Sequence, residues 1–299
     1  MSRAVEIEVP ASSANLGVGF DVVALALDLQ LRISVRAIDG PESSLSVEGE
    51  GRARLALDES NRFLAGFRAG WREVNGGAVP ALEVAMENEI PLGRGLGSSA
   101  AATVAGLLAA EALAGSDLDS DTTLRLATET EGHPDNAAAA LVGGFVIVAD
   151  GRVTRLDPPA ELRCVLFVPE REMATADMRA VLPATVSHAD AVHNAARLAV
   201  LVAAFATGDL ALLSAMNDDR LHEPYRAAVF PELPVLKAAA IEAGALGAAL
   251  SGAGSSVIAL ADERAAQAVA VALDEAAESG GLAGTIRMIR PATDGAVVR

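Results

Sequence analysis

Alternating apolar and polar positions predict three strands in the first hundred residues. In residues 5–9, three aliphatic side chains alternate with two glutamates, which is the period-two pattern of a strand with one buried face. Residues 31–36 repeat this alternation, and residues 82–86 place large apolar side chains at every second position. We therefore expect a sheet in the N-terminal part of the chain, with one face buried.

Apolar residues at helical spacing predict helices between and after these strands. Residues 61–75 place five large apolar side chains at this spacing, and Asn61 can cap the N-terminus of the helix. Residues 98–115 are rich in alanine and leucine and end at a glycine, which favours a helix with a glycine stop. A further helix is expected at residues 121–131.

The second half of the chain again mixes strands and helices. Residues 143–156 predict a hairpin, and residues 157–161, with two prolines, suggest a boundary between an N-terminal domain, residues 1–157, and a C-terminal domain, residues 158–299. In the second domain we expect strands at residues 162–168, 255–260 and 285–289. We also expect one helix that ends at Pro183 and helices at residues 189–216 and 233–243. Strands and helices in both halves predict an α+β protein.

Composition and charge limit the kinds of molecule that this protein is expected to bind. The 299 residues carry a formal net charge of -17, which argues against nucleic acid, because binding to a phosphate backbone needs clustered lysine and arginine. Lys237 is the only lysine, so the G-x-x-x-x-G-K-[ST] phosphate loop is excluded. Any phosphate that this protein binds must therefore be held by local groups.

The sequence favours a protein of a reducing compartment. Cys164, the single cysteine, lies in an apolar run and is expected to be a packed core thiol. Glu6 and Glu8 stand where a secretory signal needs its apolar stretch, so we expect no signal peptide. The uncharged residues 243–261 contain several glycines and predict a helix end, a strand, a loop and a strand, not a membrane span. The expected location is the cytoplasm, without a membrane partner.

Residues 91–101, PLGRGLGSSAA, are the most informative segment. Three glycines alternate with larger residues, so the backbone can approach a ligand closely and adopt positive φ angles. Ser98 and Ser99 then open the expected helix, whose first amide groups lack partners and together carry a charge of about +0.5. Such a helix start can bind an anion without a lysine. The alternative is a glycine-rich turn capped by serine.

Two further motifs accompany this loop, PASSANLGVGFD at residues 10–21 and LSGAGSSVIAL at residues 250–260. Together the three motifs resemble those of the GHMP kinase family. The resemblance implies an N-terminal domain like ribosomal protein S5 domain 2, a ferredoxin-like C-terminal domain, commonly a homodimer, and ATP and Mg2+ as cofactors. The nucleotide-binding residues that it implies are Asn61, Pro91, Leu92, Gly93, Arg94, Gly95, Leu96, Gly97, Ser98, Ser99, Ala100 and Ala101.

Within this family, the sequence is similar to members that phosphorylate the side-chain hydroxyl of L-homoserine to O-phospho-L-homoserine, a step of threonine biosynthesis. The similarity rests on HPDN at residues 133–136 and on the segments TADMRAVLP and HEPYRAAVFPEL. It implies that Asp21 pairs with the ammonium of the substrate. Arg179 and Arg226 would meet its carboxylate, which a planar guanidinium can hold through two parallel hydrogen bonds.

The resemblance also assigns the remaining roles in the site. The implied substrate-binding residues are Asn15, Asp21, His133, Asn136, Arg179 and Arg226. The implied catalytic residues are Asn136, Arg179 and Thr175.

The metal ligands and the general base leave alternatives open. Ser98 is an implied magnesium ligand, and of the two glutamates before the HPDN motif we choose Glu129 over Glu131. Residues two apart on a helix point to different faces, so we do not expect both to reach the same ion. Asp135 is the nearby carboxylate, but related kinases pair such a base with a lysine that this chain lacks. We therefore favour transfer by positioning, without a strong base. Alternative functions are another GHMP kinase, acting on mevalonate, a sugar or shikimate, and a nucleotide sensor without catalysis.

Overall fold

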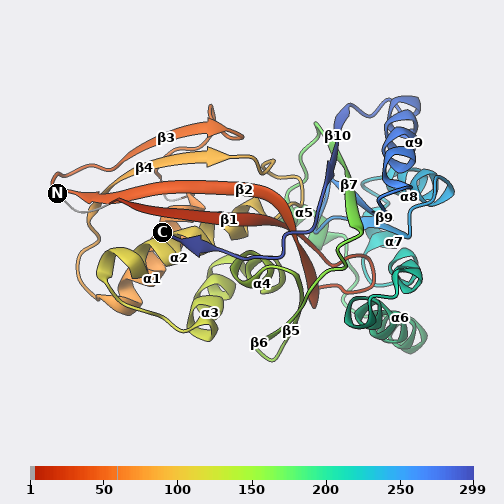
Figure 1. Cartoon of the computed structure of the whole chain (residues 1–299), viewed down its shortest axis with the longest axis horizontal. Coiled ribbons are helices and arrows are strands. Elements are labelled where there is room, and N and C mark those ends of the chain that lie inside the picture. Colours follow the sequence, from red (N-terminus) through yellow and green to blue (C-terminus); the bar gives the residue numbers. More distant parts are fainter. Residues whose placement is uncertain (1–3, 59) are drawn as a thin grey trace.

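Two sheets organise the computed structural model, which describes residues 4–58 and 60–299 (Figure 1). The larger sheet has seven strands in the order β11-β1-β2-β4-β3, with β5 paired to β2 and β6 paired to β5. Its strands are β1 (Val5–Ala14), β2 (Val23–Ile38), β3 (Ser44–Gly49), β4 (Ala81–Asn88), β5 (Phe145–Ala149), β6 (Arg152–Leu156) and β11 (Val297–Val298). The pair β3 and β4 is parallel, and the other pairs are antiparallel.

The strands expected from alternation form the centre of this sheet. They lie in β1, β2 and β4, where Ile7 is the partner of Ile33 and Ile33 is the partner of Met86. All three side chains are buried, so the alternation predicted the face that packs into the core. The predicted hairpin is also present, since β5 and β6 pair antiparallel.

Four helices cover one face of the larger sheet (Figure 1). They are α1 (Arg62–Val74), α2 (Ser98–Ala114), α3 (Ser120–Glu131) and α4 (Asp135–Val142). Helices α1 and α2 pack closely at Gly66, where an added Cβ would lie only 2.1 Å from the carbonyl oxygen of Thr103. The missing side chain of glycine permits this approach. Helix α2 also packs against β1, and the amide of Ser12 donates to the carbonyl of Leu96. These contacts hold the N-terminus of α2 beside the end of β1.

The smaller sheet has the strand order β10-β7-β9-β8, with every pair antiparallel. In chain order within this half the strands run 4-1-3-2, which is the ferredoxin-like arrangement. The strands of this sheet are β7 (Leu162–Pro169), β8 (Gly247–Leu250), β9 (Val257–Asp262) and β10 (Gly284–Ile289). The helices of the same half are α5 (Thr175–Ala180), α6 (His188–Thr207), the 3-10 helix η1 (Leu210–Asn217), α7 (Glu223–Arg226), α8 (Leu233–Glu242) and α9 (Ala266–Ser279). The predicted α+β class is confirmed.

One hydrophobic core extends from the larger sheet into the smaller one. Phe145 of β5 stacks on Phe205 of α6 with ring centroids 3.9 Å apart, and Leu166 of β7 belongs to the same buried cluster. The last strand, β11, returns to pair with β1, so the end of the chain joins the N-terminal sheet (Figure 1). The division at residues 157 and 158 stays a prediction.

The expected helix at residues 189–216 is divided in two. Helix α6 ends at Gly208, whose φ of 72° is left-handed, and the Asp209 side chain then accepts from the amide of Ala211 to begin η1. Residues 243–261 form the C-cap of α8, β8, a loop and β9, as predicted.

Within the described part of the chain, α6 is one helix that is long and apolar enough to cross a membrane by length and composition alone. The buried residues of α6 include Leu201, Ala204 and Phe205, which belong to the hydrophobic core. Core helices pass the same test, so this property by itself is a weak indication of a membrane span.

Candidate active site

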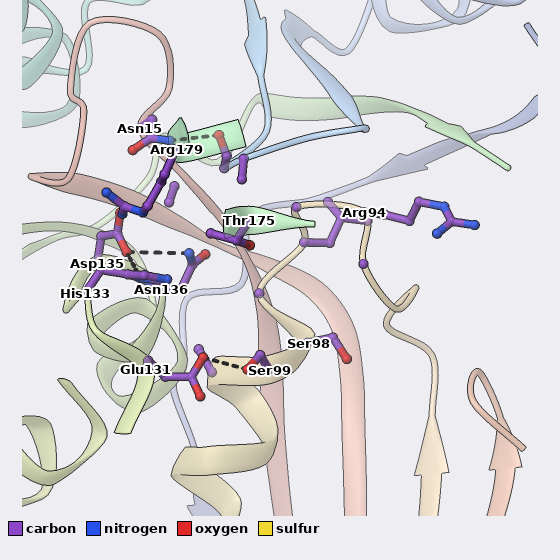
Figure 2. Close-up of a pocket in the computed structure, with 18 of the residues that line it drawn as sticks. Asn15, Arg94, Ser98, Ser99, Glu131, His133, Asp135, Asn136, Thr175 and Arg179 are labelled. Carbon is purple, nitrogen blue, oxygen red and sulfur yellow. Dashed lines mark hydrogen bonds and ion pairs between the residues drawn. The ribbon is translucent and has the colours of Figure 1, made fainter. Parts of the chain in front are cut away.

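A cavity of about 180 Å3 lies where the three sequence motifs meet (Figure 2). It is bordered by the N-terminal motif, the glycine loop before α2, the α3–α4 connection, the start of α5, α7 and the loop after β8. The expected site residues that line it are Asn15, Asp21, Pro91, Gly93, Arg94, Gly95, Leu96, Gly97, Ser98, Ser99, Ala100, His133, Asn136, Thr175, Arg179 and Arg226. Residues that are distant in the sequence are therefore brought to one site.

The glycine loop has the backbone geometry of an anion site. Gly93, Gly95 and Gly97 have φ angles of 67°, 72° and 71°, which favour glycine. A Cβ at Gly97 would also lie 2.1 Å from the hydroxyl oxygen of Ser12. Gly97 is the N-cap of α2 and supplies no side-chain hydrogen bond, so the first amide groups of α2 are not capped by this residue. The start of α2 can therefore donate to a ligand.

Direct hydrogen bonds join the three motifs. The Ser251 hydroxyl lies 2.8 Å from both the Ser13 hydroxyl and the Gly95 carbonyl oxygen. The Asn15 side-chain amide donates to the carbonyl of Gly252 at 2.8 Å. The N-terminal and C-terminal motifs therefore fix the shape of the glycine loop, a role that the sequence did not assign to the two serines.

Arg94 contributes its backbone to the cavity and directs its guanidinium elsewhere (Figure 2). This group donates to the carbonyls of Leu92, Pro169 and Glu170. Burial lowers the pKa of Arg94. Its side chain thus anchors the loop to the end of β7, whereas the resemblance implied a nucleotide contact.

Glu131, and not Glu129, is the carboxylate that reaches the glycine loop. The Glu131 side chain is 4% exposed and accepts from the Ser99 hydroxyl at 2.6 Å (Figure 2). It also accepts from the Thr103 hydroxyl at 2.6 Å. The Glu129 side chain is 60% exposed and pairs with Arg125 at 3.0 Å. The structure therefore places Glu131 at the loop and Glu129, the expected metal ligand, away from it, because residues two apart on α3 point to different faces.

The donor set fits a magnesium ion that arrives with a nucleotide. Mg2+ is bound in such sites by one or two carboxylates together with phosphate oxygens and water. Glu131, the last residue of α3, supplies a carboxylate at this cavity, and Ser98 and Ser99 supply hydroxyl oxygens at the start of α2. Among the described residues no group of three or more histidine, cysteine or acidic side chains is arranged so that it could hold a metal ion.

The opposite side of the cavity is built from charged side chains. Arg179 donates to both carboxylate oxygens of Asp21, at 2.9 and 2.7 Å. Arg226 is fully buried and donates to the carbonyls of Gly252 and Met178. Burial and the neighbouring Arg179 lower the pKa of Arg226 to about 10, so both arginines remain charged at neutral pH.

The ion pair between Asp21 and Arg179 differs from the separate roles implied by the resemblance. A zwitterionic ligand carries one ammonium and one carboxylate, so it can replace this internal pair with two pairs of its own. The ring of Phe20 lies 5.5 Å from the guanidinium carbon of Arg179 and 5.3 Å from that of Arg226. One aromatic ring therefore supports both cations.

His222 holds Arg226 in place and was not identified from the sequence. Its Nδ1 lies 3.0 Å from a guanidinium nitrogen of Arg226, and its Nε2 lies 2.8 Å from the carbonyl oxygen of Gly17. Because arginine only donates, Nδ1 must accept and Nε2 must carry the proton. Burial lowers the pKa of His222, which favours this neutral form. The i,i+4 spacing of the two residues in HEPYR could have indicated the contact.

The HPDN segment places a second set of polar groups at the cavity. Asp135 accepts from His133 Nδ1 at 2.9 Å and from the Asn136 amide at 2.7 Å. The Asn136 side-chain oxygen accepts from the Ser12 hydroxyl at 2.8 Å, which fixes the orientation of its side-chain amide. The hydrogen bond to Asp135 raises the pKa of His133.

A second cavity of about 200 Å3 adjoins the glycine loop and is lined mainly by apolar atoms. Its walls include Leu31, Leu55, Met86 and Leu92. Asn61 also lines it, but its side chain caps α1 through the amide of Leu64 and donates to the carbonyl of Ala56. The remaining expected nucleotide residue, Ala101, is buried in the core and lines neither cavity.

Comparisons with known proteins agree with this fold and loop. The family models for the GHMP kinases N terminal domain and the GHMP kinases C terminal match residues 61–144 and 201–279. The chain is 41% identical to the homoserine kinase of Moorella thermoacetica over 296 residues, which are 98% of this chain and 99% of that protein. It is 43% identical to the homoserine kinase of Streptomyces avermitilis over 276 residues, covering 90% of this chain and 89% of that one.

A solved structure extends this likeness to three dimensions. The crystal structure of homoserine kinase from Cytophaga hutchinsonii matches with a TM-score of 0.88 and 31% identity, covering 100% of this chain and 98% of that chain. The chain therefore belongs to the GHMP kinase family, as its three motifs predicted. Within that family, these three relatives bear the name homoserine kinase.

Proposed function

We propose that this protein transfers the γ-phosphoryl group of ATP to the side-chain hydroxyl of L-homoserine. The observation that carries the proposal is the presence of two complementary binding surfaces in one cavity. One surface is the uncapped start of α2, which suits an anion, and the other is the Asp21, Arg179 and Arg226 group, which suits an amino acid. The names of the relatives support the same substrate.

The nucleotide would occupy both cavities. Its phosphates would lie over residues 91–101, where three glycines and the first amides of α2 form the anion site. The base would enter the apolar cavity beside Leu31, Leu55 and Met86. Ser98 and Ser99 line both cavities, so they would lie between base and phosphates.

Glu131, Ser98 and Ser99 would hold the magnesium ion. When bound, the ion neutralises charge on the phosphate oxygens and orients them for transfer. The hydroxyls of Ser99 and Thr103 keep the Glu131 carboxylate aimed at the loop. Mg2+ is therefore a proposal that rests on the chemistry of the donors.

The acceptor would be bound through its ammonium and carboxylate, and its hydroxyl would be oriented for transfer. Asp21 would pair with the ammonium, and Arg179 and Arg226 with the carboxylate. Asn136 would orient the hydroxyl, since its amide is fixed by Ser12. Asn15 and His133 would complete this pocket, with Thr175 near the transferred phosphoryl group.

Transfer itself needs in-line placement and charge neutralisation more than covalent chemistry. Asp135 is the nearby carboxylate, and it already accepts hydrogen bonds from His133 and from the amide of Asn136. We therefore propose that positioning, and not a strong protein base, drives the reaction. The homodimer and the cytoplasmic location stay predictions, which gel filtration and cell fractionation can test.

A coupled assay of ADP release tests the proposed function. With ATP and Mg2+, L-homoserine should support turnover, whereas mevalonate, shikimate and sugars should give rates near the background with ATP alone. Faster turnover of an alcohol without an amino-acid backbone would favour another GHMP kinase. Nucleotide binding without transfer to any acceptor would indicate a sensor.

A further inference from the structure

The junction between the two cavities contains one arginine that the resemblance did not assign. Four residues line both cavities: Arg62, Gly93, Ser98 and Ser99. Any ligand that extends from the apolar cavity to the polar one must pass these residues. Arg62 is the charged side chain among them.

The guanidinium of Arg62 faces the candidate metal carboxylate. One of its nitrogens lies 3.9 Å from a carboxylate oxygen of Glu131 and donates to the carbonyl of Thr130 at 3.2 Å. The side chain is 49% exposed, so it has room to change partner. Glu131 meets Ser99 through its other carboxylate oxygen, which places Arg62 next to the glycine loop.

The other two arginines that line the nucleotide side are held by different groups. Arg94 donates to backbone carbonyls near the end of β7, and Arg54 pairs with Glu172. Glu172 also pairs with Arg94 at 3.0 Å. Of these arginines, Arg62 is therefore the one whose charge is directed at the junction.

The position of Arg62 is unfavourable for helix α1 alone. It is the first residue of α1, and the first turn contains no acidic residue. A cation at a helix N-terminus is disfavoured by the partial positive charge there. An anion bound to the guanidinium would offset this unfavourable interaction.

We infer that Arg62 binds a phosphate group of the nucleotide at this junction. The inference rests on the proposed function, because it requires that a nucleoside polyphosphate fills both cavities. A polyphosphate carries several negative charges, while the start of α2 supplies only about half a positive charge. The chain has no lysine at the loop, and the planar fork of arginine matches phosphate oxygens well. Arg62 would thus supply a full positive charge that the glycine loop lacks.

Titration of Arg62→Gln with adenosine, AMP, ADP and ATP tests this inference. We expect the dissociation constants of ADP and ATP to rise about 10- to 100-fold, the range for losing a charge-assisted hydrogen bond. Adenosine affinity should stay unchanged, because adenosine carries no phosphate. The first member of the series at which the loss appears identifies the phosphate that Arg62 contacts.

Two matched variants separate charge from structure. Arg68→Gln removes an exposed arginine from the same helix and should bind all four ligands like the unmodified protein. Arg62→Lys keeps the charge and should recover part of the ADP and ATP affinity. A uniform loss that includes adenosine, or ADP and ATP affinities within twofold of the unmodified protein, would overturn the role of Arg62. If the unmodified protein itself bound neither ADP nor ATP, the proposed function would fail instead.

Discussion

The proposed nucleotide side and the proposed acceptor side of the cavity are built by different means. The nucleotide side depends on one continuous segment, residues 91–101, whose glycines adopt positive φ angles before α2. The acceptor side depends on side chains from distant segments, such as Asp21 and Arg179, which are 158 residues apart and joined by two hydrogen bonds. A backbone site can be recognised from a local pattern, but a side-chain site requires the fold to bring its members together.

The two sides also differ in the burial and the partners of their charged groups. On the nucleotide side, Glu131 accepts from two hydroxyl groups, and the side chain of Arg62 beside it is half exposed. On the acceptor side, Arg226 is a full charge in a buried setting, held by carbonyls and by His222. Substitutions should therefore affect nucleotide use through geometry and metal binding, and acceptor use through unpaired charge.

The largest effect is expected from Glu131→Gln on the nucleotide side. Loss of the proposed metal ligand should lower kcat by about 1000-fold, or about 4 kcal/mol, because metal binding contributes several kcal/mol to the transition state. The matched variant Glu129→Gln, which removes an exposed carboxylate on the same helix, should stay within about twofold. Steady-state rates over a Mg2+ series measure both. Equal losses in the two variants would contradict the assignment to Glu131.

Arg226→Ala should give the largest change on the acceptor side. We expect a loss of about 2 to 5 kcal/mol in homoserine binding, since one partner of a buried charge pair is removed. The KM for ATP should change little, because Arg226 lies on the other surface of the cavity. Initial rates over both substrates separate these effects, and calorimetric nucleotide binding verifies that the variant is folded. An unaltered KM for homoserine would contradict the proposed contact between Arg226 and homoserine.

Gly97→Ala tests how far the nucleotide side depends on backbone geometry. The new Cβ would meet the Ser12 hydroxyl at 2.1 Å and occupy a φ of 71°, so we expect a fall of roughly 100-fold in kcat/KM for ATP. Gly115→Ala is the control, because Gly115 has a φ of 66° at the other end of α2 and an added Cβ there would meet no atom within 4 Å. Similar activity losses in both variants would mean that helix strain, and not the loop, is responsible.

The smallest effect concerns the pH dependence that His222 contributes on the acceptor side. Burial lowers the pKa of His222, while Asp219 and Glu223 oppose this shift and Arg226 adds to it. In the unfolded chain histidine takes up a proton near pH 6.5. The folded protein should therefore lose stability as the pH falls below about 6.5, because protonation favours the unfolded state. Between pH 5 and 8, the unfolding temperature of His222→Gln should fall less on acidification than that of the unmodified protein. An equal fall in both proteins would contradict the role of His222 in this pH dependence.

The local sequence was sufficient for most of the elements and for the glycine loop, but it did not show the break between α6 and η1. Alternation predicted the central strands β1, β2 and β4, and the order strand, glycine loop, helix predicted the anion site before α2. These features depend on neighbours within a few residues, where side-chain period and glycine backbone freedom decide the outcome. The motifs also predicted the family, which the comparisons confirm.

The tertiary structure alone decided which of the candidate groups meet. Glu129 and Glu131 are nearly equivalent in sequence, and only the packing of α3 against α2 directs Glu131 to Ser99. The pairing of Asp21 with Arg179 and the place of Arg62 between two cavities likewise depend on the fold. The physical reason is that the direction and burial of a side chain are set by contacts between elements, which a local pattern does not contain.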